Sequence, residues 1–285
     1  MDPSPDQAAK YGGTENVRPK TERGRLAQLA SDRALTLFFI LAYLLSWLVF
    51  LPMVLLEGPI QLVILASFGP SLAATITHRL GTGSFRAFHF YTTASRTLLV
   101  TALGSILIVV SYVVLPGVTT GDPSKLNWRI LASLSLYNYS TFLGGPLGEE
   151  PGWRGYALPR LEAHLGPLWG SMLLGILWAG WHLPLFLIPG CISSPLWVYV
   201  LITIGLSIIL AVATNLARFA VIPAIVMHAV FNTASKFLNG LFIEVQPSAP
   251  VRFELVLGLC GLGVGLVLAL VTRGRLVYRR HLEPL

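Results

Sequence analysis

The sequence predicts an all-α polytopic membrane protein with about eight transmembrane helices around a polar intramembrane cavity. Hydrophobic residues make up 54% of the 285 residues, and the mean hydropathy is +0.69. Only 12% of the residues are charged, whereas a soluble globular domain has roughly 25%. Repeated apolar runs approach the length of a membrane span. These observations exclude a soluble globular domain and a disordered chain.

The N-terminal segment differs from the rest of the chain. Residues 1–33 are polar, contain Pro, Gly and charges of both signs, and lack a helical stripe, so we expect a flexible cytoplasmic tail. A cleaved signal peptide is not expected, because the first apolar run starts near Ala34 and is longer than a signal-peptide core. Residues 34–285 are predicted to form one integral membrane domain. Its two cysteines, Cys191 and Cys260, form neither a disulfide framework nor a CxxC metal site.

Apolar runs define the predicted helices, since a bilayer core requires about 20 apolar residues per helix. Seven continuous runs are predicted to span at 35–56, 59–78, 97–116, 167–189, 196–215, 219–238 and 253–272. An eighth stretch, 131–163, is apolar at first and then contains glycines, prolines and charges. We interpret it as one long spanning segment with a break near its middle.

The loop charges predict that both chain ends are cytoplasmic. The loops and tail assigned to the inside contain Arg79, Arg86, Arg96, Arg160, Arg218, Arg273, Arg275, Arg279 and Arg280. The outer side contains or adjoins Lys125, Arg129, Lys236 and Arg252. This excess of basic residues inside follows the positive-inside rule and explains the net charge of +7 without nucleic acid. The stretch 85–96, with phenylalanines and arginines, is predicted to lie at the cytoplasmic interface.

Polar and ionisable residues inside the predicted spans are concentrated at three places. A charged residue at the centre of a span costs roughly 2.5–3.5 kcal/mol, so such residues face a protein interior or a wet cavity. The three places hold Glu149, Glu150 and Arg154, then His182, and then His228 with Asn232. Most of the seven tryptophans lie near predicted helix ends and are expected in the membrane interface, although Trp178 and Trp181 are placed to line the cavity.

Spacing separates the two adjacent glutamates. Glu150 and Arg154 are four residues apart, so one helical face brings them together and the pair lowers the cost of burying either charge. Glu149 lies about 100° round the helix from Glu150, so it points elsewhere. His228 and Asn232 are also four residues apart and can point into one cavity.

Each polar place has a structural explanation when it is taken singly, because intramembrane His, Asn and Glu–Arg pairs often hold helices together. Together, a carboxylate, two imidazoles and an amide are what water-activated amide hydrolysis needs. The sequence contains no His-Glu-x-x-His, Gly-x-Ser-x-Gly or Gly-rich phosphate loop. Zincin-type proteolysis and ATP-driven activity are therefore disfavoured.

At these residues the sequence resembles the CPBP (CAAX protease and bacteriocin-processing, or Abi) intramembrane proteases, which include the Rce1-type CAAX prenyl endopeptidases. The resemblance spans about 131–235. The family's three motifs occur in order as Glu149-Glu150-Pro151-Gly152-Trp153-Arg154, as Trp178 to His182, and as His228 to Asn232. The family usually has Phe at the position of Trp178.

The resemblance implies eight helices around a cavity open to the cytoplasmic leaflet. It implies endoproteolysis, typically the removal of the last three residues after a prenylated cysteine. It further implies that Glu149 with His182 activates water, and that His228 with Asn232 holds the oxyanion. The Glu–Arg pair of the first motif then has a supporting role.

No cofactor is expected. Glu149, His182 and His228 lie on three predicted helices, and no two of them have the i, i+4 spacing of a zincin site. Zinc remains an alternative, because these same three residues are also a zinc ligand set. The expected partners are the lipid bilayer and a membrane-tethered or lipidated peptide or protein, from CAAX-type prenyl-protein or bacteriocin processing, and not nucleic acid. The expected location is the inner membrane in a bacterium or the endoplasmic reticulum membrane in a eukaryote.

A non-catalytic function is the alternative hypothesis. A membrane transporter, or a scaffold or immunity protein, would use the same polar cluster for binding. A transporter favours inverted repeats with matching broken helices in both halves. The sequence has one clearly broken segment, near Gly145 and Pro146.

Overall fold

The computed structural model describes residues 33–90, 92–115, 142, 144–189, 191–192, 194–245 and 250–278, without the side chains of 113, 236–245 and 250–253. The predicted tail, the loop positions Lys125 and Arg129, and the first part of segment 131–163 therefore lie outside the described residues. In the described part the chain is helical, apart from one isolated β-bridge between His89 and Ala220. The all-α prediction is confirmed for these residues.

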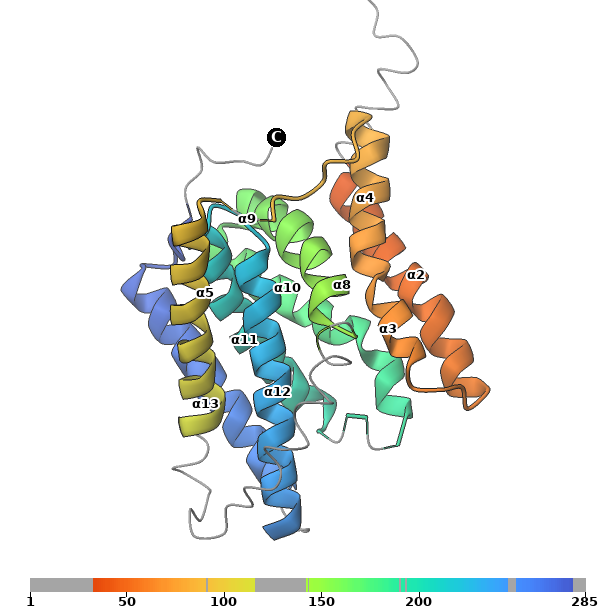
Figure 1. Ribbon diagram of the computed structural model, residues 1–285, viewed down its shortest axis with the longest axis vertical. Coiled ribbons are helices and arrows are strands. Elements are labelled where there is room, and N and C mark those ends of the chain that lie inside the picture. The colour runs from red at the N-terminus through yellow and green to blue at the C-terminus, as the bar shows by residue number, and fades with distance from the viewer. Residues whose placement is uncertain are drawn as a thin grey trace, which may run out of the picture.

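The helices follow one another in the order shown in Figure 1. Their bounds are α2 Ala34–Leu55, α3 Leu62–Ser67, α4 Gly69–Thr82, α5 Ala94–Val109, η2 Val110–Val114, α8 Pro146–Glu150, η4 Pro151–Ala157, α9 Leu158–Leu165, α10 Pro167–Trp181, η5 Leu183–Leu187, α11 Leu196–Leu216, α12 Ile222–Val245 and α13 Pro250–Val271. Helices α8, α10, α11 and α12 occupy the middle, with α2 to α4 on one flank and α5 and α13 on the other (Figure 1).

Each of the eight predicted apolar segments overlaps at least one helix. Within the described residues, four helices are long and apolar enough to cross a membrane by themselves: Ala34–Leu55, Ala94–Tyr112, Leu196–Leu216 and Glu254–Val271. Several other predicted spans are divided into shorter helices. The chain is thus an integral membrane protein, and the total of eight crossings remains a prediction.

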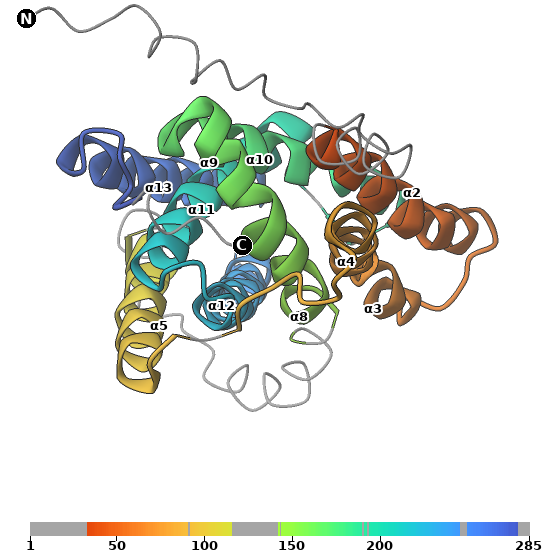
Figure 2. The same cartoon turned by 90° about the horizontal axis from the view of Figure 1, so that it is seen from above.

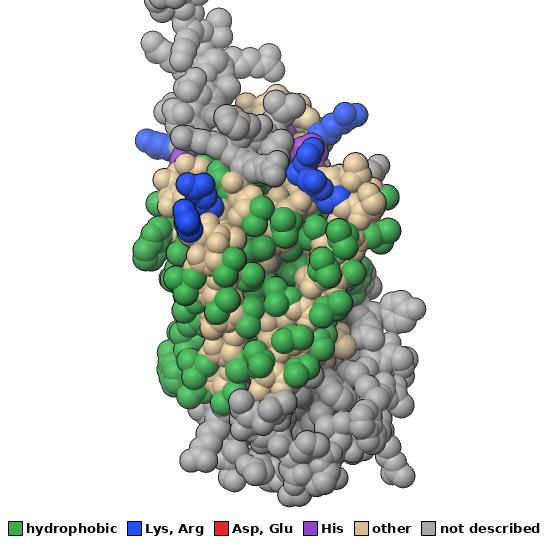
Figure 3. All heavy atoms as spheres, turned by 90° about the vertical axis from the view of Figure 1, so that its left-hand side faces the viewer, with side chains coloured by type: hydrophobic (Ala, Val, Ile, Leu, Met, Phe, Trp, Pro, Cys, Tyr) green, Lys and Arg blue, Asp and Glu red, His purple; other side chains and the backbone are tan. Residues whose placement is uncertain are grey.

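One end of the bundle is basic. Figure 3 shows basic side chains, which are arginines in the described part of the chain, gathered at one end of the face formed by α5 and α13, above a surface that is mostly hydrophobic. Leu98, Leu103 and Ile106 are exposed on α5, as expected for side chains that face lipid. The start of α2 and the end of α13 lie at the basic end (Figure 1), in agreement with the predicted cytoplasmic position of both chain ends.

Backbone hydrogen bonds hold the stretch predicted at the cytoplasmic interface against the helix bundle. Residues 84–90 lie between α4 and α5 and form no helix. The carbonyl groups of His89 and Phe90 accept hydrogen bonds from the N–H groups of Val221 and Ile222, at 2.9 and 3.1 Å. The connection therefore lies against the start of α12.

This arrangement predicts which positions react with a membrane-impermeant thiol reagent. In a variant without Cys191 and Cys260, a cysteine at Arg275 is expected to react from the cytoplasmic side. A cysteine at Thr120, in the predicted outer loop, is expected to react from the opposite side. Labelling of intact and inverted membrane vesicles measures both. Reaction of the two positions from the same side would contradict the predicted topology.

The segment that carries the two adjacent glutamates lies in the centre of the bundle. Seen from above, α8 lies between α4 and α12 (Figure 2). Gly148 faces the backbone of Ser67, where an added Cβ would lie 2.7 Å from the carbonyl carbon, and Gly152 faces the backbone of Pro70 just as closely. Both positions therefore need glycine, because a larger residue would push α8 and η4 away from α3 and α4.

The helix changes its geometry at Pro151. The π-helical segment η4 begins at this residue, which has no backbone N–H to continue the α-helical pattern. Short π-helical turns inside α-helices often occur at functional sites. Here the change comes directly after Glu149 and Glu150.

Candidate active site

The four residues predicted to be catalytic line one cavity of about 110 Å³. Glu149 comes from α8, His182 directly follows α10, and His228 and Asn232 come from α12. The cavity lining does not include Glu150 or Arg154, whose side chains are 0% exposed. The fold therefore separates the predicted catalytic residues from the predicted supporting pair.

Glu149 is oriented by a tryptophan. Its side chain is buried, and its Oε2 accepts a hydrogen bond from Nε1 of Trp178 at 2.7 Å. Its other oxygen, Oε1, has no hydrogen-bond partner among the described residues. Oε1 of Glu149 can therefore accept a hydrogen bond from a molecule that enters the cavity.

Glu150 pairs with two groups. Its Oε1 accepts a hydrogen bond from Nη1 of Arg154 at 2.9 Å, as the four-residue spacing predicted. The same oxygen lies 2.7 Å from Nδ1 of His228 on α12. The sequence analysis missed this second contact, which connects the first motif to the third. A carboxylate only accepts hydrogen bonds, so Nδ1 of His228 carries its hydrogen here.

The hydrogen bond at His182 fixes its tautomer. Its Nδ1 lies 2.8 Å from the carbonyl oxygen of Trp178, which can only accept a hydrogen bond. In the neutral ring Nδ1 therefore carries the hydrogen and Nε2 carries the lone pair. Nε2 makes no hydrogen bond to another residue in the described ranges. His182 can thus accept a proton or bind water from the cavity side.

Helix α2 holds the end of α10 in place. The chain changes from α10 to the 3-10 helix η5 around His182, close to Pro184, which lacks a backbone N–H. Tyr43 Oη donates to the carbonyl of Leu177, and Trp47 Nε1 donates to the carbonyl of Trp181 at 2.9 Å. Trp47 thus satisfies a carbonyl group that the end of the helix leaves unpaired, and Tyr43 binds the same helix one turn earlier. Sequence analysis did not predict either contact.

Aromatic rings surround the polar groups. The His182 ring centroid lies 4.7 Å from that of Trp181 and 5.3 Å from that of Tyr199. Trp178, Trp181 and Tyr199 all line the cavity, which confirms the prediction for the two tryptophans. Tyr199 was missed, because it lies in an apolar run where an aromatic residue is also expected in a helix core or at the membrane interface.

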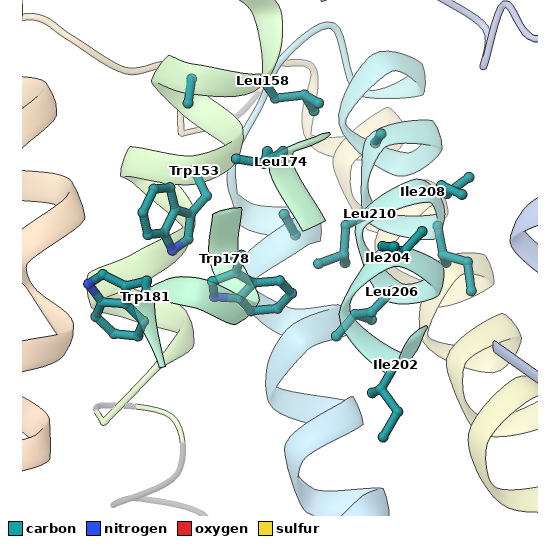
Figure 4. Packing of buried hydrophobic residues seen from close by; sticks show 14 of the residues in the cluster. Trp153, Leu158, Leu174, Trp178, Trp181, Ile202, Ile204, Leu206, Ile208 and Leu210 are labelled. Carbon is teal, nitrogen blue, oxygen red and sulfur yellow. The ribbon is translucent and has the colours of Figure 1, made fainter. Parts of the chain in front are cut away.

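The interface prediction is wrong for one tryptophan. Trp169 and Trp197 are 65% and 56% exposed, as a membrane-interface position requires, whereas Trp153 is 0% exposed. Figure 4 shows Trp153, Trp178 and Trp181 grouped on one side of the core, opposite the aliphatic side chains of α11. Trp153 lies in η4 at the centre of the bundle, so its ring contacts protein instead of the membrane interface.

The zinc alternative stays a prediction. In the part of the chain that the structure describes, no group of three or more His, Cys, Asp and Glu side chains is placed to hold a metal ion. A catalytic zinc site needs three protein ligands at about 2.0–2.2 Å. Glu149, His182 and His228 line one cavity.

Two comparisons support the resemblance that the motifs predicted. Residues 131–234 match a family model described as type II CAAX prenyl endopeptidase Rce1-like. The CAAX prenyl protease 2 of Methanococcus maripaludis is 30% identical over 98 residues, which are 32% of this chain and 36% of that relative. The chain thus matches about a third of the length of this curated relative. The resemblance to the Rce1-like family is confirmed over the segment that contains all three motifs.

Proposed function

We propose that the protein is an intramembrane endopeptidase that hydrolyses a peptide bond of a membrane-tethered substrate. The observation that carries the proposal is the single cavity lined by Glu149, His182, His228 and Asn232. These side chains come from α8, the end of α10 and α12, and together they supply the groups needed for hydrolysis by water. The match to the Rce1-like model over residues 131–234 supports the same reaction class.

Glu149 and His182 are suited to activate water. Each offers one acceptor without a partner among the described residues, Oε1 of Glu149 and Nε2 of His182. A water molecule bound by both would transfer a proton to Glu149 while its oxygen bonds to the carbonyl carbon of the substrate. The carbon–nitrogen bond then breaks, and the departing amine takes the proton from Glu149.

His228 and Asn232 are suited to stabilise the oxyanion of the intermediate. With Nδ1–H bound to Glu150, His228 can donate from Nε2 when the ring carries both protons. The Asn232 amide supplies a neutral second donor.

The membrane setting and the matches support one substrate class. A prenylated or otherwise lipidated peptide reaches a site inside the bilayer because its anchor already lies in the lipid. The name of the relative in Methanococcus maripaludis refers to CAAX prenyl proteins, which supports a substrate that ends in a prenylated CAAX sequence. Much of the cavity wall is apolar, with Phe50, Val63 and Leu185 contributing.

The proposal is tested with purified protein in liposomes and two fluorescent peptides. One peptide ends in a farnesylated CAAX sequence, and the other has the same residues with a palmitoyl anchor at its N-terminus. Wild-type protein is expected to release the C-terminal fragment, and His182→Ala is expected to be at least about 100-fold slower. The control is His164→Ala, which changes an exposed histidine of α9 and should leave the rate unchanged.

The two peptides separate the hypotheses. Cleavage of the farnesylated peptide alone would support CAAX processing, and cleavage of both would support a broader endopeptidase. Binding without cleavage of either peptide would overturn the proposal in favour of a transporter or a scaffold.

Removal of metal ions is expected to leave the activity intact. The reason is that the described carboxylate and imidazole groups do not form a preformed zinc site. The measurement is the cleavage rate and the zinc content of protein washed with a chelator, before and after zinc is added back. Stoichiometric zinc whose loss and return track activity would contradict this prediction and make Glu149 or Glu150 a ligand.

A further inference from the structure

We propose that Trp178 is a positioning residue that holds the Glu149 carboxylate ready for catalysis, an inference that rests on the proposed function. Trp178 lies in the last turn of α10 and is buried. Its Nε1–H donates to Oε2 of Glu149 at 2.7 Å.

The hydrogen bond selects one carboxylate oxygen. The indole N–H is a donor only, so it binds an oxygen of Glu149 and cannot remove a proton from it. Because Oε1 has no hydrogen-bond partner among the described residues, it is the oxygen that is open to water. A base held in one rotamer by a neighbouring hydrogen bond loses less entropy in the transition state than a free side chain.

The indole ring is itself held between charged and aromatic neighbours. The guanidinium carbon of Arg154 lies 4.3 Å from the centroid of the Trp178 ring. The ring of His228 contacts Trp178 nearly perpendicularly, at an interplanar angle of 88° and 5.0 Å between centroids. The position of the indole N–H is therefore fixed before substrate binds.

Trp178 also contacts His182, through its ring and through its backbone. Its carbonyl oxygen lies 2.8 Å from Nδ1 of His182, and this contact survives any change of side chain. The variant Trp178→Phe therefore removes the indole N–H and makes the ring smaller, while it retains an aromatic ring and the backbone bond that orients His182. The loss of ring volume is matched by a control variant.

A matched control lies nearby. Among the buried tryptophans, Trp153 is 0% exposed, its Nε1 has no partner among the described residues, and it does not line the cavity. Trp153→Phe makes the same chemical change in a similarly buried position, without altering a hydrogen bond to Glu149. Differences between the two variants then report the Trp178–Glu149 contact.

The experiment measures kcat and KM of both variants on the cleavable peptide, together with their thermal unfolding. Trp178→Phe is expected to lower kcat about tenfold and to leave KM within about twofold, and Trp153→Phe is expected to retain the wild-type kcat. Equal kcat values for the two variants would overturn the proposal. A raised KM with unchanged kcat would also overturn it, because it would indicate a contact to the substrate.

A second measurement does not depend on turnover. In protein labelled with ¹⁵N at the tryptophan indoles, Trp178→Phe identifies the signal of Trp178 by its loss. Glu149→Gln is expected to shift that signal and to leave the signal of Trp153 in place. If wild-type protein cleaves no peptide, the proposed function fails and this spectrum alone decides the contact. A shift would support the positioning of Glu149 by Trp178, and an unchanged signal would overturn it.

Discussion

Glu149→Gln is expected to lower the cleavage rate by at least about 100-fold, and by up to about 10⁴-fold, while the protein remains folded. Glutamine has the shape of glutamate, and its amide oxygen can still accept the hydrogen bond from Trp178. An amide cannot take a proton from water, however, so the base is lost. Cleavage assays give the rate, and size-exclusion chromatography with thermal unfolding gives the folded state.

The matched control is Glu57→Gln, which makes the same change at an exposed position between α2 and α3. It should retain both the wild-type rate and the wild-type unfolding temperature. Turnover near the wild-type rate in Glu149→Gln would exclude Glu149 as the base. Loss of folding in Glu149→Gln, with loss of turnover alone in Glu150→Gln, would mean that the two glutamates have exchanged roles.

Changes to the buried ion pair are expected to act on folding. In Glu150→Gln or Arg154→Ala, one charge remains in a fully buried position without its partner. Removing one partner of a buried pair typically costs about 3–5 kcal/mol, which is a large part of the stability of a folded protein. The measurements are the folded yield after detergent extraction and the unfolding temperature, with exposed Arg86→Ala as the control.

A double variant tests whether the destabilisation comes from the unpaired charge. In Glu150→Gln/Arg154→Met no charge of the pair remains, and replacement of both partners of a buried pair is often close to neutral. The double variant is therefore expected to be less destabilised than the sum of its single changes, which a double-mutant cycle measures. Single variants that unfold like the wild-type protein would contradict the structural role of the pair.

Local sequence rules predicted the helical segments and two features of the polar site. These are the Glu150–Arg154 pair and the separation of Glu149 from Glu150. Apolar runs identify helices because a bilayer leaves the backbone no other way to pair its polar groups. The Glu150–Arg154 pair follows from four-residue spacing on one helix turn. The separation of Glu149 from Glu150 follows from helical geometry, and only Glu149 lines the cavity.

The remaining contacts depend on tertiary packing. Glu150 and His228 are separated by 78 positions, and no local period connects them. The bond from Trp178 to Glu149 spans 29 positions, and it depends on how α8 and α10 pack together. The burial of Trp153 was missed because the sequence pattern does not distinguish a tryptophan that faces the membrane from one that packs inside the bundle.

The support that α2 gives to α10 has a consequence for attempts to reduce this protein to a minimal unit. The segment that matches the family model begins at residue 131, yet the turn before His182 is bound by Tyr43 and Trp47. A fragment that starts at residue 131 would lose both donors, although it would retain every motif residue. The segment with the motifs is therefore not expected to keep its structure when it is expressed alone. A truncated or chimaeric protein must also contain α2.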